Sequence, residues 1–149
     1  MTSNTSVLNN LIETLKDGQE GFRAASEDVK SSDLKTLFSE FSLQRSSFAG
    51  ELQALVHDLG EGEPEDSGSV GGALHRGWID LKSALTSRDD HAILSECERG
   101  EDVAVAAYRK ALEDPDISAP VADTLQRQYG DVKAAHDRVK ALRDATATK

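Results

Sequence analysis

Apolar residues recur at spacings of three and four along four long stretches of the chain, and this rhythm constrains the fold more than any other feature. Such spacing puts apolar side chains on one face of an α-helix, because a helix turns once in about 3.6 residues. No stretch shows the convincing alternation of a half-buried strand. We therefore predict an all-α protein in which each helix buries one stripe. The first stripe is Leu8, Leu11, Leu15, Gly18, Phe22, Ala25 and Val29.

Capping and breaking residues set the ends of the predicted helices. Gly60 is a typical residue to follow the end of a helix. Ser32 is expected to cap the second long helix, and Ser87 with Asp90 forms a capping box for the third. In a single domain spanning 1–149, we expect long helices at about 7–29, 33–59, 88–113 and 119–143, and a short helix at about 72–86.

Two tightly joined helix pairs flank a long middle connection, which begins with the acidic, Gly-rich segment GEGEPEDSGSVGG. An up-down-up-down bundle would not need such a connection. A tight pair, a crossover and a second tight pair are instead typical of ferritin-like bundles, in which the second and third long helices run parallel. We therefore predict a ferritin-like four-helix bundle with a long crossover that contains an extra short helix.

Composition argues against several functional classes. The chain has 149 residues, of which 38% are hydrophobic and 30% charged, as in a soluble domain with one core. Its formal net charge of −10 argues against nucleic acid and anionic membrane surfaces as partners. No apolar run approaches the roughly 20 residues of a membrane span. The single cysteine and the absence of a visible secretory signal predict a cytoplasmic protein.

Three phrases of the sequence carry a family resemblance: LNNLIETLKDGQEGF, GSVGGALHRGWIDLKSAL and ECERGEDVAVAAY. From about residue 7 to 143 the chain resembles a bacterial family of four-helix bundles, classed as a domain of unknown function with a ferritin-like fold. The resemblance implies a ferritin-like bundle in a bacterial cytoplasm, and ferritin-like relatives suggest an association with stress. It implies no activity.

The sequence lacks the pattern that supplies a ferritin-like di-iron site. Such a site draws a Glu-x-x-His pair from each of two helices. Three positions before each of the four histidines stands a residue that is not an acid. We therefore expect no metal cofactor at the centre of the bundle.

Polar residues nevertheless fall on the inner faces at mid-height of the predicted bundle. Arg45 and Glu101 lie at comparable distances from the starts of two helices that should run parallel. A buried carboxylate needs a partner, and a guanidinium offers a fork of donors, so we expect an ion pair in place of the metal. Amide side chains should satisfy the remaining polar groups. The predicted buried polar layer consists of Gln19, Gln44, Arg45, Glu101 and Gln128.

Two other interpretations of these acids stay open. In the first, Glu98 and Glu101 bind iron or manganese together with His136, in a degenerate di-metal-carboxylate protein that acts as an oxidase or a store. Glu98 and Glu101 lie three residues apart, so a helix presents them on one face. In the second interpretation these charges belong to a solvated helix face.

The short-helix region offers a candidate surface site at His75, Arg76 and Trp78, unless the indole covers the end of the bundle. Glycines within the predicted helices, such as Gly21 and Gly100, leave room for a ligand or allow neighbouring helices to approach closely. We favour close approach of helices.

These observations together predict a non-catalytic cytoplasmic protein. We expect an interaction or stress-associated structural role, with a protein partner or self-association, as in a homodimer. No partner, ligand or oligomeric state can be read from the sequence.

Overall fold

The protein is all-α, as predicted. The computed structural model describes residues 4–59, 78, 84–86 and 89–147. Within these residues no strand occurs, and none of the helices is long and apolar enough to cross a membrane. The long helices are α1 (Asn4–Asp28), α2 (Ser32–Leu59), α4 (Asp90–Glu113) and α5 (Ala119–Ala147).

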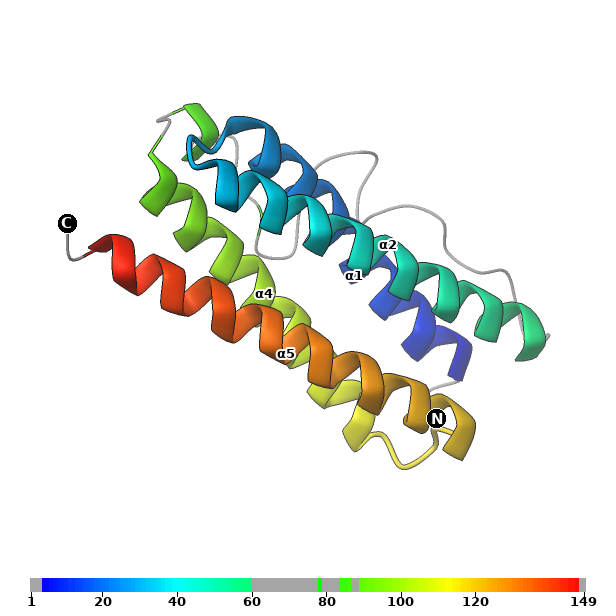
Figure 1. Cartoon of the computed structure of the whole chain (residues 1–149). Helices are drawn as coiled ribbons and strands as arrows, with labels where there is room; N and C mark the ends of the chain where they lie inside the picture. The colour runs from blue at the N-terminus through cyan, green and yellow to red at the C-terminus, as the bar shows by residue number, and fades with distance from the viewer. Residues whose placement is uncertain (1–3, 60–77, 79–83, 87–88, 148–149) are drawn as a thin grey trace.

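The four long helices form two antiparallel pairs that pack into a bundle (Figure 1). α1 lies against α2, α4 lies against α5, and α1 also packs against α4. Figure 1 shows α2 and α4 running in the same direction, so the chain between Leu59 and Asp90 joins opposite ends of the bundle. This parallel relation is the one that brings residues of α2 and α4 to a common level.

The start of α2 is capped one residue earlier than expected. The backbone N–H of Leu34 donates to Oγ of Ser31 at 3.3 Å, in the geometry of an N-cap. Ser31 therefore caps α2, and Ser32, the residue that we expected to cap it, is the first helical residue. An N-cap residue has non-helical backbone angles, so Ser31 still belongs to the short turn after α1.

The start of α4 also differs from the expected capping box. Asp89 is the N-cap, and its side chain accepts a hydrogen bond from the first turn. Asp90 instead accepts hydrogen bonds from the backbone N–H groups of Lys30 at 2.8 Å and Ser31 at 3.1 Å. It thereby fastens α4 to the turn between α1 and α2. Ser87 lies outside the described residues.

The far end of α5 is longer than expected. The helix continues to Ala147, beyond the predicted end at residue 143. Oγ1 of Thr146 lies 2.8 Å from Nδ1 of His91 on α4. This contact holds the last turn against the neighbouring helix, which a periodicity argument on α5 alone does not detect.

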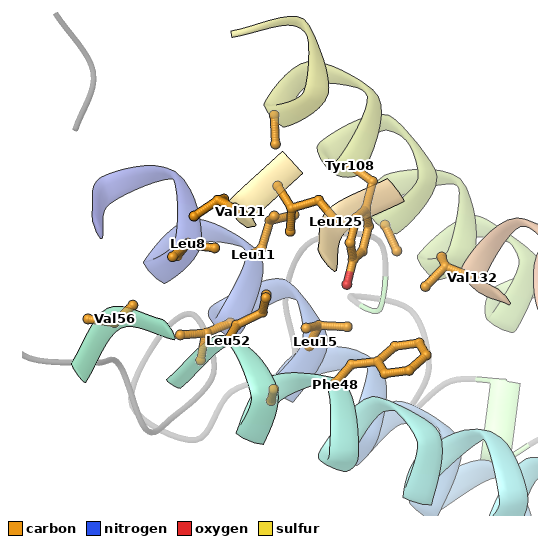
Figure 2. Close-up of a cluster of buried hydrophobic side chains, with 14 of the residues drawn as sticks. Leu8, Leu11, Leu15, Phe48, Leu52, Val56, Tyr108, Val121, Leu125 and Val132 are labelled. Atoms are coloured by element: carbon orange, nitrogen blue, oxygen red, sulfur yellow. The ribbon is translucent and has the colours of Figure 1, made fainter. Parts of the chain in front are cut away.

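Two clusters of buried apolar side chains make up the core. The first lies where α1 begins and α2 ends, and Figure 2 shows its side chains converging from all four long helices. The second occupies the other half of the bundle and includes Phe22, Phe38 and Trp78. Along α2 and α4 the residues of the two clusters are separated by a short gap. Arg45 falls in the gap on α2 and Glu101 in the gap on α4.

Trp78 is inserted between helices rather than placed over the end of the bundle. Its side chain is buried and contacts Phe22, with ring centroids 5.1 Å apart. A Cβ on Gly21 would lie 2.4 Å from its Cε3 atom, and a Cβ on Gly100 would lie 2.1 Å from its Cε2 atom. The two glycines therefore admit the indole between α1 and α4, and the expectation of direct helix-to-helix approach at these positions is wrong.

Most of the short helix expected at 72–86 lies outside the described residues, including His75 and Arg76. Residues 84–86 are helical. Because Trp78 is buried, the predicted surface site loses its aromatic member.

Candidate functional site

A buried ion pair lies between the two apolar clusters. Nη2 of Arg45 donates to Oε2 of Glu101 at 2.7 Å, and Nη1 donates to Oε1 of the same carboxylate. Arg45 is 1% exposed and Glu101 is fully buried. The two parallel bonds match the fork of the guanidinium to both carboxylate oxygens. The pair joins α2 to α4, as the sequence argument requires.

The surroundings of Arg45 fix its position. Nε donates to Oε1 of Gln44 at 3.2 Å, and the guanidinium lies over the ring of Phe22, 5.4 Å from its centroid. A Cβ on Gly18 would lie 3.7 Å from Cγ of Arg45, an ordinary contact. Burial lowers the pKa of Arg45, but the charge of Glu101 and its hydrogen bonds outweigh this effect, so the pKa lies above its ordinary value. The guanidinium is therefore charged.

Gln128 is fully buried but belongs to a separate polar contact. The hydroxyl of Tyr108 donates to its Oε1 at 2.7 Å. Its Nε2 donates to the backbone carbonyl of Phe48 at 3.4 Å and to Oε1 of Glu51 at 3.3 Å. Burial raises the pKa of Tyr108 far above its ordinary value, so its hydroxyl keeps the proton that it donates. Gln128 thus pairs with Tyr108 inside the first apolar cluster, not with Arg45.

The two amides from the first helix pair differ in their contacts. Gln44 accepts the bond from Arg45 described above. Gln19 is half-buried, its backbone carbonyl accepts from Oγ of Ser42 at 2.9 Å, and its buried Oε1 has no hydrogen-bond partner among the described residues. Of the predicted layer, the structure therefore brings together Arg45, Glu101 and Gln44.

A second polar cluster lies where α4 faces α5. Glu98, Asp102 and His136 each offer one ligand atom, and these atoms all lie within 4.8 Å of one another. Nε2 of His136 is 2.6 Å from Oδ1 of Asp102 and 3.9 Å from Oε1 of Glu98. From the sequence we grouped His136 with Glu98 and Glu101. The structure places His136 beside Glu98, but Glu101 is bonded to Arg45, and Asp102 is the third member of the cluster.

The signal for Asp102 was present in the sequence. Glu98 and Asp102 are four residues apart, a spacing that puts two side chains on the same side of a helix. Glu101 lies three residues from Glu98 and fits the same rule about equally well. Only the position of α5 and of Arg45 decides which of the two acids meets His136.

The fold and the central site define an all-α bundle whose middle is held by a buried ion pair. The chain belongs to the family described as Domain of unknown function (DUF2383), whose model matches residues 3–114. That match covers Arg45 and Glu101, whereas the whole of α5, with Gln128 and His136, lies beyond it. No curated protein matches the chain.

Proposed function

We propose that the protein is a non-catalytic, ferritin-like bundle of the bacterial cytoplasm, in which the Arg45–Glu101 pair takes the place of a central metal site. In this proposal it acts through contacts with a protein partner or a second copy of itself, in a structural, stress-associated role. The parallel course of α2 and α4 supports the ferritin-like connectivity (Figure 1). The net charge of −10 favours protein over nucleic acid as a partner.

The observation that carries the proposal is the bidentate pair itself. Both oxygens of Glu101 accept hydrogen bonds from Arg45, and both residues are buried. A guanidinium charge at this position repels a cation that would bind the same carboxylate. Glu101 can therefore serve as a central metal ligand only if Arg45 moves away, which would leave a buried charge without its partner.

The other reactive groups near the pair are held in unreactive states. Burial raises the pKa of the Cys97 thiol well above its ordinary value, and the charges of Glu101 and Glu96 raise it further. A thiol that keeps its proton is a poor nucleophile. The hydroxyl of Tyr108 is engaged with Gln128. These properties support a structural centre in preference to a catalytic one.

The runner-up is a degenerate iron or manganese protein that uses Glu98, Glu101 and His136. Its support is weaker, because Glu101 is bonded to Arg45 and is not a member of the cluster around His136.

Metal analysis of purified protein tests the proposal against the runner-up. The chain would be expressed with added iron and manganese and purified without a chelator, alongside Glu101→Gln and His136→Gln. We expect the metal content of wild type and Glu101→Gln to be the same. Near-stoichiometric iron or manganese that disappears in Glu101→Gln would overturn the proposal. Metal that disappears only in His136→Gln would belong to the cluster between α4 and α5.

A further inference from the structure

The cluster of Glu98, Asp102 and His136, called the seam cluster below, combines an imidazole with two carboxylates from two helices. Glu98 and Asp102 stand on α4, and His136 reaches them from α5. Imidazole and carboxylate together are the ligands that Zn²⁺, Mn²⁺ and Fe²⁺ accept in proteins. The seam cluster uses neither Arg45 nor Glu101, so it is independent of the central ion pair.

The imidazole of His136 is held with one nitrogen directed at the two acids. Its Nδ1 lies 3.0 Å from Oδ1 of Asp137, and its Nε2 is the nitrogen that faces Asp102 and Glu98. Oδ2 of Asp137 in turn accepts from Nζ of Lys133 at 3.1 Å. A carboxylate on the far nitrogen is the usual device that orients a metal-binding histidine and makes it a stronger ligand.

The two oxygens of Glu98 have different environments. Oε2 is bonded to Nη1 of Arg143, whereas Oε1 faces Nε2 of His136 at 3.9 Å. Arg143 also bonds to Asp144, at 2.8 Å. Arg45 occupies both oxygens of Glu101 and is buried, whereas Arg143 bonds to Oε2 of Glu98 and its side chain is 29% exposed, so water partly screens its charge and Oε1 stays available to a cation. Glu98 is only 8% exposed, and of its two oxygens one is bonded to Arg143 and the other faces the cluster.

The distances between the ligand atoms suit one small ion. Tetrahedral zinc with bonds of about 2.0–2.2 Å holds its ligand atoms about 3.3 Å apart. The separations from Nε2 of His136 are 2.6 Å to Asp102 and 3.9 Å to Glu98, which bracket that value. The Asp102 side chain is 62% exposed, so a small outward rotation of its carboxylate would not disturb the core. Its exposure also leaves room for water to complete the coordination.

We propose that Glu98, Asp102 and His136 bind one divalent transition-metal ion, such as Zn²⁺, and so clamp α4 to α5. Asp137 positions the imidazole and Arg143 positions Glu98. This goes beyond the function proposed above, which concerns the centre of the bundle and a partner. A bound ion would link α4, which lies within the family match, to α5, the whole of which lies beyond the matched residues.

Titration of chelator-treated protein with zinc, followed by calorimetry, tests the proposal. We expect one saturable site per chain in the wild type, no saturable binding in His136→Gln, and weakened binding in Asp102→Asn. Asp137→Asn should weaken binding about 10- to 100-fold, the usual effect of removing the group that orients a ligand. Asp102 is exposed, so its variant keeps the core intact.

Matched controls separate this site from other zinc binding. His91 is also half-buried, but it lies on α4 and contacts Thr146 and not the seam cluster. His91→Gln should therefore leave the zinc affinity unchanged. Glu101→Gln should also leave it unchanged, which keeps this test separate from that of the central pair. Zinc should raise the melting temperature of the wild type but not of folded His136→Gln. Equal zinc affinity in wild type and His136→Gln, or no saturable binding by the wild type, would overturn the proposal.

Discussion

A Cβ atom on Gly100 would lie 2.1 Å from Cε2 of Trp78, so the indole ring fills the space that a side chain on α4 would need. Gly21 stands in the same relation to the ring from α1. A residue of the crossover is therefore part of the core of the bundle, packed between two helices that come before and after it in the chain. The indole fits there because Gly21 and Gly100 have no side chains.

Replacing Gly100 by Ala should destabilise the protein. Alanine normally stabilises a helix interior by about 0.5–1 kcal/mol relative to glycine. Here the added methyl group collides with a ring that is buried on both sides, and overpacking of this kind costs about 1–3 kcal/mol. Urea unfolding of Gly100→Ala measures the net change, and we expect a lower free energy of unfolding.

Gly50→Ala and Gly130→Ala are the matched controls. Both glycines are exposed in long helices, and a Cβ on either would meet nothing within 4 Å. Both variants should therefore gain stability by about 0.5–1 kcal/mol. A Gly100→Ala protein as stable as these controls would show that Trp78 does not occupy the space beside α4.

The Cys97 thiol should resist modification in the folded protein. Because burial raises its pKa, the native thiol keeps its proton at a pH where an unfolded cysteine, with a pKa of about 8.5, ionises. An aromatic disulfide reagent at pH 8 should therefore label native protein far more slowly than protein in urea. Rapid labelling of the native state would contradict the buried position of this residue.

The same pKa shift predicts how stability changes in alkali. The folded-state pKa of Cys97 lies above the unfolded one, so the unfolded chain releases this proton first as the pH rises. The contribution of the thiol to the free energy of unfolding is thus complete below about pH 8.5 and declines above it. Urea unfolding between pH 8 and 10 should show this decline in the wild type, and a shallower one in Cys97→Ala.

Tyr108→Phe should cost about 1–3 kcal/mol, because it leaves Oε1 of buried Gln128 without its donor. Tyr129→Phe is the control: its hydroxyl accepts an exposed bond from Arg109 at 2.8 Å, and its loss should change stability by no more than about 0.5 kcal/mol. Thermal and urea unfolding of both variants provide the comparison. Equal effects of the two substitutions would mean that the Tyr108–Gln128 bond contributes nothing specific.

The helices could be predicted because periodicity is a local property. Each apolar stripe specifies a helix face without reference to the rest of the chain. The level shared by Arg45 and Glu101 followed from one further assumption, that the second and third long helices run parallel. Both residues lie on their stripes, so that direction favoured a buried pair over the alternative of a solvated helix face.

Other features depend on tertiary contacts that the sequence does not encode locally. The position of Trp78 depends on the course of the crossover, for which helix periodicity has no rule. Gln128 lies on the inner stripe of α5, but its amide oxygen accepts a hydrogen bond from nearby Tyr108 and not from Arg45. Asp102 was missed because a helix face with acids three and four residues after Glu98 does not show which one meets α5.

A double-mutant cycle on Arg45 and Glu101 tests the central claim most directly, with Arg45→Met and Glu101→Leu made singly and together. Each single variant should lose on the order of 3–5 kcal/mol of unfolding free energy, because it leaves a buried charge unpaired, while the double variant loses far less than the sum. The exposed Arg23–Glu20 pair on α1, with side chains 52% and 51% exposed, should show little coupling in the same cycle. Additive losses at Arg45 and Glu101, within about 0.5 kcal/mol, would contradict an ion pair at the centre of this bundle.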